Sequence, residues 1–296
     1  MISAPSPERL ALKPPLKWAG GKRWLVPHLV PIWQSCPGRR LVEPFCGGVA
    51  VSLALAPAKA VLNDRNPHVI NFYSWLARGL EITMPMENDE QQFYAHRTRF
   101  NDLLRAGQHQ TAEAAALFYY LNRTGFNGLC RFNRTGEFNV PFGRYARINY
   151  RRDFLPYAKL FQRWEFRSGD FETVPLEPDD FVYADPPYDV PFTQYAAEVF
   201  RWEEQERAAE WLARHPGPVV LSNQATKRIC RLYEKLGFDL NYRDAPRRIS
   251  CTGDRTPAKE VIASRNLGAG GCGSPKSTRQ RAKVVRPAGP DLNQGG

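Results

Sequence analysis

Short apolar runs that end in polar residues recur along the chain and predict buried strands. They occupy residues 41–43, 60–63, 181–184 and 218–222, and continuous apolar runs of this length are typical of strands covered on both faces. Helical patterns lie between them at residues 49–56, 67–78 and 203–214, and Asn66 followed by Pro67 is typical of a helix start. Strands that alternate with helices indicate an α/β fold with a mostly parallel sheet.

The alternation breaks over residues 87–152. Two helical patterns at 91–104 and 112–121 are followed there by a segment rich in Arg, Gly and Asn. We interpret residues 87–152 as an inserted, mainly helical lobe and assign residues 14–86 and 153–266 to the sheet domain. Residues 1–13 and 267–296 hold too few apolar side chains to order themselves, so we expect a flexible N-terminus and a flexible basic tail.

The charge of the chain is unevenly distributed. Among 296 residues, 41 Lys and Arg outnumber 30 Asp and Glu, for a net charge of +11. Residues 170–212 nevertheless carry twelve acidic side chains against Arg201 and Arg207 only. Residues 121–152 carry seven Arg and no Lys, interleaved with six Phe and Tyr. Arginine forks and aromatic rings at this density favour a nucleic-acid partner over a merely solvated loop.

Several other classes of protein are excluded by the sequence. The most apolar stretch, residues 49–62, is too short and too polar to span a membrane, which takes roughly 20 apolar residues. The six Cys stand singly, and neither they nor the five His show the spacing of a metal site. The N-terminal residues show no apolar stretch of the length that a secretory signal requires, so we expect a cytosolic protein with reduced thiols and no metal. We also expect it to be monomeric.

Candidate chemistry gathers where the predicted strands end. Asp185-Pro186-Pro187-Tyr188 follows one strand directly, and its prolines make it a rigid platform with an acceptor carboxylate and an aromatic ring. Residues 43–48 form a glycine turn after another strand, and Asn63-Asp64 ends a third. Residues 17–22 add a glycine pair flanked by Trp18 and two Lys. Ligands bind at the carboxyl edge of such sheets, so these segments predict a nucleoside pocket beside a pocket for a planar base.

Together these segments resemble the Dam-type family of DNA adenine-N6 methyltransferases. The resemblance rests on K-W-A-G-G-K at 17–22, E-P-F-C-G-G at 43–48, N-D at 63–64, L-N-R-T-G-F-N-G-L-C-R at 121–131, G-E-F-N-V-P-F-G-R-Y at 136–145 and D-P-P-Y at 185–188. These occur in the family's order and cover residues 16–265. Val49 stands where relatives commonly carry a second glycine, and Thr124 and Phe126 stand where some carry tyrosine.

The resemblance implies a Rossmann-like methyltransferase sheet that binds S-adenosyl-L-methionine, with residues 87–152 as a target-recognition lobe for double-stranded DNA. It implies these cofactor contacts: Trp18, Lys22, Gly47, Asp64, Asp170 and Asp185. It implies these DNA contacts at a GATC-like site: Lys17, Asn127, Arg131 and Arg144. It also implies that residues 247–250 and 259–263 pair as a hairpin that reaches DNA.

The expected chemistry is methylation of an adenine amino group, whose lone pair is delocalised into the ring. Asp185 and the Pro186 carbonyl would accept both N6 hydrogens while Tyr188 stacks on the base, which must first be flipped out of the duplex. Cytosine-N4 methylation is the runner-up, but such relatives usually carry Ser in place of Asp185. A methyltransferase acting on a glutamine side chain would carry N-P-P-Y in place of D-P-P-Y. Its substrate gives no reason for an Arg-rich insert. A non-catalytic DNA-binding module is the alternative from another class.

Overall fold

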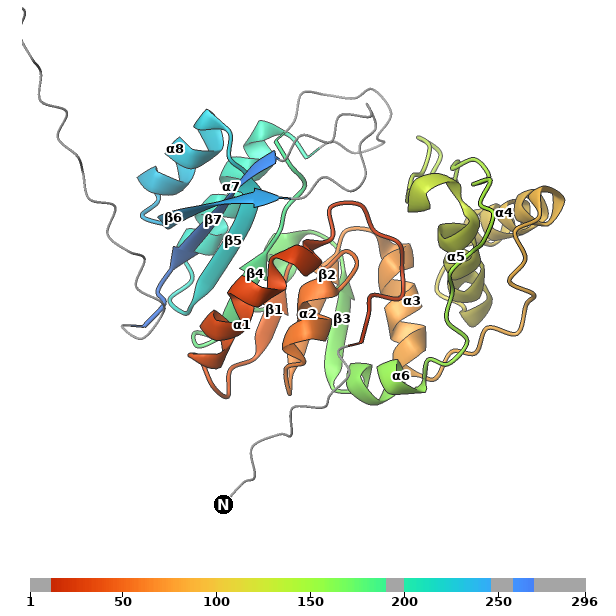
Figure 1. Cartoon of the computed structure of the whole chain (residues 1–296), viewed down its shortest axis with the longest axis horizontal. Coiled ribbons are helices and arrows are strands. Elements are labelled where there is room, and N and C mark those ends of the chain that lie inside the picture. The colour runs from red at the N-terminus through yellow and green to blue at the C-terminus, as the bar shows by residue number, and fades with distance from the viewer. Residues whose placement is uncertain (1–11, 190–199, 246–257, 269–296) are drawn as a thin grey trace, which may run out of the picture.

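The computed structural model describes residues 12–189, 200–245 and 258–268, and a seven-stranded sheet forms the centre of that part (Figure 1). The strands are β1 (Leu41–Glu43), β2 (Ala60–Asp64), β3 (Trp164–Ser168), β4 (Phe181–Ala184), β5 (Val219–Gln224), β6 (Asp239–Ala245) and β7 (Ala258–Arg265). They lie in the order β3-β2-β1-β4-β5-β7-β6. Adjacent strands from β3 to β5 in this order run parallel to one another, whereas β7 is antiparallel to both β5 and β6.

Helices cover both faces of the sheet because its strands are apolar on both sides. Leu41 and Leu62 belong to one core cluster, and Val42 and Val61, one residue away on the same strands, belong to the other. The first core is covered by α1 (Val26–Gln34), α2 (Ala50–Leu55), α3 (Pro67–Ala77) and α6 (Leu155–Phe161). The second is covered by α7 (Trp202–Ala213) and α8 (Lys227–Lys235).

The insert contains two helices, α4 (Glu90–Arg105) and α5 (Ala112–Thr124), as the sequence predicts. Asp89 and Thr111 cap them by accepting hydrogen bonds from Gln92 and Ala114 backbone N–H groups. Both helices share the apolar core of α3, and they lie at the right of Figure 1, opposite β6 and α8. Residues 125–152 follow with one short 3₁₀ helix, η2 (Phe126–Gly128), and two isolated bridges.

The structure confirms the predicted strands and helices and adds elements the sequence pattern did not indicate: α1, α6, α8, β3 and β6. One prediction is wrong in its pairing. Residues 259–263 pair with residues 240–244 rather than with 247–250. They also lie inside the sheet against β5, with Val261, Ile262 and Ala263 buried. The contact of this hairpin with DNA stays a prediction, because residues 246–257, which join its two strands, lie outside the described residues. Residues 247–250, the predicted N-terminal extension up to residue 11 and the tail from 269 lie outside the described residues.

Candidate active site

A cavity of about 1060 Å³ opens at the carboxyl edge of the sheet. It lies where β1 has β2 on one side and β4 on the other, which is the switch point at which ligands bind in open α/β sheets. Its lining brings together all four predicted motif segments, the η2 region of the insert and the turn after β3. The volume lies at the upper end of the roughly 300–1,000 Å³ of ordinary ligand pockets.

The glycine turn after β1 packs tightly against Trp18. A Cβ atom at Gly47 would lie 2.5 Å from Nε1 of Trp18, and one at Gly48 would lie 2.8 Å from its Cβ. Both glycines are therefore required by the close approach of this ring. Val49 has a φ of 51° and a ψ of 31°, the left-handed conformation that favours glycine. The backbone thus gives a physical reason why glycine suits position 49.

Asp64 ties the glycine turn to the start of α3. Its Oδ2 accepts a hydrogen bond from Gly47 N at 2.9 Å, and its Oδ1 accepts one from Asn66 N at 2.9 Å. Burial raises the pKa of the Asp64 carboxyl, and these two N–H groups oppose that rise. Tyr73 donates to Gly47 O at 2.8 Å from the opposite side. The predicted cofactor contact is therefore also a structural brace of the turn.

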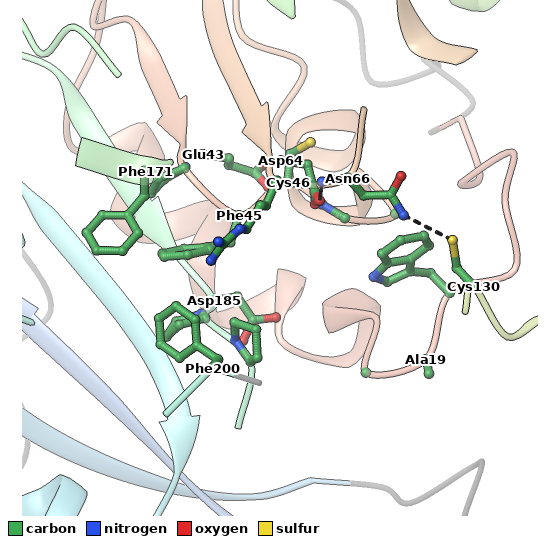
Figure 2. Close-up of a pocket in the computed structure, with 18 of the residues that line it drawn as sticks. Ala19, Glu43, Phe45, Cys46, Asp64, Asn66, Cys130, Phe171, Asp185 and Phe200 are labelled. Atoms are coloured by element: carbon green, nitrogen blue, oxygen red, sulfur yellow. Dashed lines mark hydrogen bonds between the residues drawn. The ribbon is translucent and has the colours of Figure 1, made fainter. Parts of the chain in front are cut away.

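Three aromatic rings form an apolar wall that the sequence analysis did not single out. Phe45 lies 5.3 Å from Phe171 and 5.7 Å from Phe200 between ring centroids. Figure 2 shows these rings together on one side of the cavity, near Asp185. Asp170, next to Phe171, forms an ion pair with Arg207 at 2.6 Å, and Arg207 also contacts the Phe171 ring. The wall offers an apolar surface of rings tilted against one another, beside the ion pair of Asp170 and Arg207.

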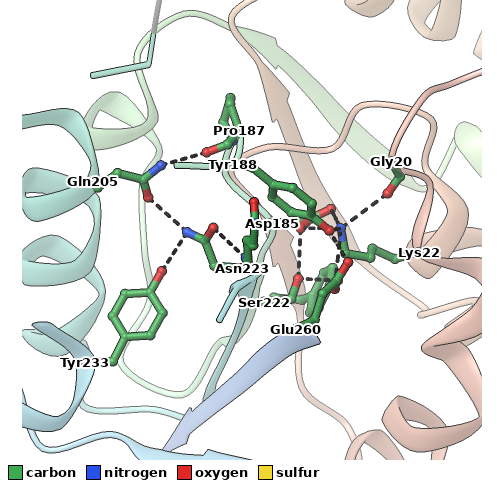
Figure 3. A network of polar contacts seen from close by, with 12 residues as sticks. Gly20, Lys22, Asp185, Pro187, Tyr188, Gln205, Ser222, Asn223, Tyr233 and Glu260 are labelled. Carbon is green, nitrogen blue, oxygen red and sulfur yellow. Dashed lines mark hydrogen bonds and ion pairs between the residues drawn. The ribbon is translucent and has the colours of Figure 1, made fainter. Parts of the chain in front are cut away.

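The segment Asp185-Pro186-Pro187-Tyr188 leaves β4 into a network of polar contacts (Figure 3). Lys22 donates from Nζ to Asp185 at 2.8–2.9 Å and to the Tyr188 hydroxyl at 2.9 Å. Ser222 of β5 donates to Asp185 Oδ1 at 2.9 Å. Gln205 of α7 donates to the Pro187 carbonyl at 2.7 Å, which anchors the backbone of the motif. The structure therefore brings Lys22 and Asp185 into direct contact from positions 163 residues apart.

The electrostatics of this network centre on Asp185, whose side chain is 20% exposed. Burial raises its pKa, and the charge and hydrogen bonds of Lys22, together with the Ser222 hydroxyl, oppose the rise. The Lys22 side chain is only 3% exposed and also donates to Gly20 O at 3.3 Å. A direct contact between Lys22 and a cofactor stays a prediction, because its ammonium group donates here to protein oxygens.

Of the predicted DNA contacts, Arg131 lines the cavity, whereas Lys17, Asn127 and Arg144 are not among its lining residues. Lys17 donates from Nζ to Arg123 O at 2.8 Å and lies over the Tyr145 ring. Burial, and then the charge of Arg123, lowers the pKa of Lys17 to about 8. Asn127 is exposed and adopts a left-handed φ of 52°. Arg144 is 82% exposed, with Glu90 at 3.6 Å.

Arg131 is more constrained than the sequence indicates. Its Nε donates to Asn139 Oδ1 at 2.7 Å and its Nη2 donates to Asn139 O at 2.9 Å. The guanidinium is therefore held in one orientation on the lining of the cavity. Asn139 lies in the quoted motif G-E-F-N-V-P-F-G-R-Y, but nothing in its spacing from Arg131 indicates this contact.

Asn66 joins the insert to the Asp64 side of the cavity. Asn66 caps α3 with its side-chain oxygen and donates from Nδ2 to Cys130 Sγ at 3.2 Å (Figure 2). Asn66 also bonds Asp64 through its backbone, and Cys130 immediately precedes Arg131. The Asp64 region and the segment that holds Arg131 are thus linked through the Asn66 side chain.

Two negative findings apply to residues 12–189, 200–245 and 258–268 alone. No group of three or more His, Cys, Asp or Glu side chains there is arranged to hold a metal ion. No helix in the same residues has the length and hydropathy to cross a membrane.

The strand order and the cavity at the switch point define a Rossmann-like α/β protein with an inserted lobe. A sequence model of the D12 class N6 adenine-specific DNA methyltransferases matches residues 18–249, and the chain belongs to this family.

Individual relatives agree with this membership. The chain is 34% identical over 262 residues to the Retron Ec67 DNA adenine methylase of Escherichia coli, and the match covers 84% of this chain and 90% of that protein. It is 36% identical over 271 residues to a DNA adenine methylase of Vibrio cholerae serotype O1, covering 84% and 94%. It is 35% identical over 266 residues to the DNA N-6-adenine-methyltransferase of Escherichia phage P1, covering 83% of this chain and 34% of that longer protein.

Proposed function

We propose that this protein transfers a methyl group from S-adenosyl-L-methionine to the N6 amino group of adenine in double-stranded DNA, within a short GATC-like site. The observation that carries the proposal is the position of Asp185-Pro186-Pro187-Tyr188 in a cavity that also holds the recognition segment. One cavity then serves both the reacting group and the residues that read its surroundings. Family membership supports the class of reaction, and the residue roles below are part of the proposal.

The residues on the cofactor side fit S-adenosyl-L-methionine. When bound, this molecule supplies an electrophilic methyl group on a sulfonium ion. The carboxylates of Asp64 and Asp170 suit hydroxyl and amino donors, and the wall of Phe45, Phe171 and Phe200 suits a flat purine ring. The residues proposed to hold the cofactor are Trp18, Lys22, Gly47, Asp64, Asp170 and Asp185.

The residues of the D-P-P-Y motif are proposed to activate the amino group. The Asp185 carboxylate and the Pro186 carbonyl accept its two hydrogens, so the nitrogen lone pair turns out of the ring plane toward the methyl donor. Tyr188 stacks on the base. The bond from Gln205 to Pro187 and the bond from Ser222 to Asp185 hold these acceptors in place before substrate arrives. Such preorganised acceptors contribute through electrostatics and positioning rather than through a covalent intermediate.

The insert is proposed to select the site and to support base flipping, which costs a few kcal/mol that contacts in the pocket offset. Lys17, Asn127, Arg131 and Arg144 contact DNA in this proposal. Arg131 is the candidate for reading a guanine edge, because Asn139 already orients its planar fork. Arg144 is exposed enough to meet a phosphate.

Transfer of a labelled methyl group from S-adenosyl-L-methionine to duplex DNA tests the proposal, with wild type and Asp185→Ala compared. We expect N6-methyladenine with wild type, no label with Asp185→Ala, and equal DNA binding by both. Long-read sequencing of DNA from cells that express the chain reports the modified base and its context. Methyl transfer by Asp185→Ala near the wild-type rate, or label in N4-methylcytosine, would overturn the proposal.

A further inference from the structure

Glu260 lies beside the catalytic motif although it comes from a distant part of the chain. Because β7 is antiparallel to β5, its first residues lie at the same edge of the sheet as the end of β5, where Glu260 pairs with Gln224. The two-residue alternation of strands puts Glu260 on the sheet face of Ser222. Lys22 approaches that face from η1 (Lys22–Trp24).

The two oxygens of the Glu260 carboxylate have different surroundings. Oε1 accepts a hydrogen bond from the Tyr188 hydroxyl. Oε2 is buried and accepts no hydrogen bond from the described residues, but it lies 4.0 Å from Lys22 Nζ. The side chain is only 4% exposed. One carboxylate oxygen is therefore directed at the ammonium group of Lys22 without being bonded to it.

A buried carboxylate with an unpaired oxygen is costly to keep, because burial withdraws it from water without a full set of donors. Burial raises the pKa of Glu260, and the charge of Lys22 opposes the rise. A glutamine would still accept the Tyr188 hydrogen bond, so that bond alone does not require a charge. The unsatisfied oxygen is explained if it receives a donor in another state of the site.

Asp185 is in the opposite situation to Glu260, because both of its carboxylate oxygens already accept hydrogen bonds. Its Oδ1 accepts from both Lys22 and Ser222, and its Oδ2 accepts from Lys22 as well. A carboxylate paired with an ammonium group is a weaker acceptor for a neutral amino group than one whose charge is free. Moving Lys22 away with no second acid nearby would leave two buried charges uncompensated. In the described residues, Glu260 is the other carboxylate paired with Lys22.

We propose that Glu260 is a positioning residue that takes Lys22 from Asp185 when the target amino group binds. In the structure Lys22 bonds Asp185; with adenine bound, Lys22 shifts by little more than 1 Å to bond Glu260 Oε2. The flexible four-carbon stem of lysine allows such a shift. Asp185 then meets the amino group with its full charge, and Lys22 stays neutralised. This inference rests on the proposed function.

The first test compares single-turnover methyl transfer by wild type, Glu260→Gln and Glu260→Asp on a duplex with one target site. We expect Glu260→Gln to slow transfer by about tenfold or more and Glu260→Asp to recover most of that loss, since it keeps the charge. Binding of cofactor and of DNA, measured separately, should change by less than about twofold. Asp244→Asn is the control, because it removes one acid from an exposed position on neighbouring β6.

The second test is a crystal structure with S-adenosylhomocysteine and target duplex. Lys22 Nζ is expected at about 2.7–2.9 Å from Glu260 Oε2 and beyond hydrogen-bond distance from Asp185. This readout applies even if Glu260→Gln fails to fold. A Glu260→Gln variant with the wild-type rate, or Lys22 still on Asp185 with adenine bound, would overturn the inference alone. Absence of methyl transfer by wild type would overturn the proposed function, and this inference with it.

Discussion

Replacement of Asp64 by alanine tests whether one carboxylate serves both the fold and the cofactor. The change removes the acceptor of two backbone N–H groups, from Gly47 and Asn66, each bonded at 2.9 Å. A hydrogen bond to a charged group is worth about 1.5–3 kcal/mol, so the two bonds amount to about 3–6 kcal/mol. Part of this cost is offset, because the substitution also removes a buried carboxylate. The raised pKa of Asp64 indicates that burial disfavours its charged form. We expect a net loss of about 2–4 kcal/mol in the free energy of unfolding.

Thermal unfolding and calorimetry with S-adenosyl-L-methionine measure the two roles separately. A loss of this size lowers Tm by roughly 4–16 °C in a domain of this length. The cofactor Kd should rise at least about tenfold, because the glycine turn loses its brace. Asp64→Asn should fall between wild type and Asp64→Ala, since its amide oxygen still accepts one N–H. Asp153→Ala is the control, because it removes an acceptor bonded to Leu155 N at 2.8 Å on an exposed side chain.

The two measurements separate the possible failures. A wild-type Tm in Asp64→Ala would refute the hydrogen-bond reasoning. A lowered Tm with an unchanged cofactor Kd would leave Asp64 a structural role only.

Three further predictions concern the reaction, target choice and pH. Asp185→Asn should lower kcat by about 10²–10³-fold, because one preorganised acceptor loses its charge; single-turnover kinetics at saturating cofactor measure this. Arg131→Ala should cost about 1–3 kcal/mol of sequence discrimination, whereas Arg152→Ala should weaken binding to all sequences alike and reduce the salt slope by about 1. Methylation of a randomised duplex library at two salt concentrations distinguishes these effects, and uniform loss with Arg131→Ala would reassign base reading. Burial raises the pKa of Glu43 from 4.5 to about 8, so the folded state binds more protons than the unfolded chain, and stability falls as pH rises through that range. Urea unfolding of Glu43→Gln at pH 5, 7 and 9 should show less of this fall, and an equal fall would contradict it.

Local sequence signals predicted the elements that are buried or capped. The runs that became β1, β2, β4 and β5 are apolar on both faces, and Asn66-Pro67 starts α3 where expected. The missed strands, β3 and β6, have exposed polar residues and form the two edges of the sheet. An edge strand is covered by fewer neighbours, so its sequence needs fewer apolar residues and gives a weaker pattern.

The sequence by itself determined the α/β class, the insert, and the D-P-P-Y, glycine-turn and Asp64 motifs, because turns, caps and apolar runs act over a few neighbouring residues. Only the tertiary structure decided which of these residues touch. The antiparallel insertion of β7 between β5 and β6 brings Glu260 to Tyr188, and the bonds from Arg131 to Asn139 and from Asn66 to Cys130 depend on how loops fold over the cavity. Periodicity reveals which face of a strand is buried but not which strand lies beside it. Strand order and loop packing are set by contacts between residues far apart in the chain, and these carry no local signal.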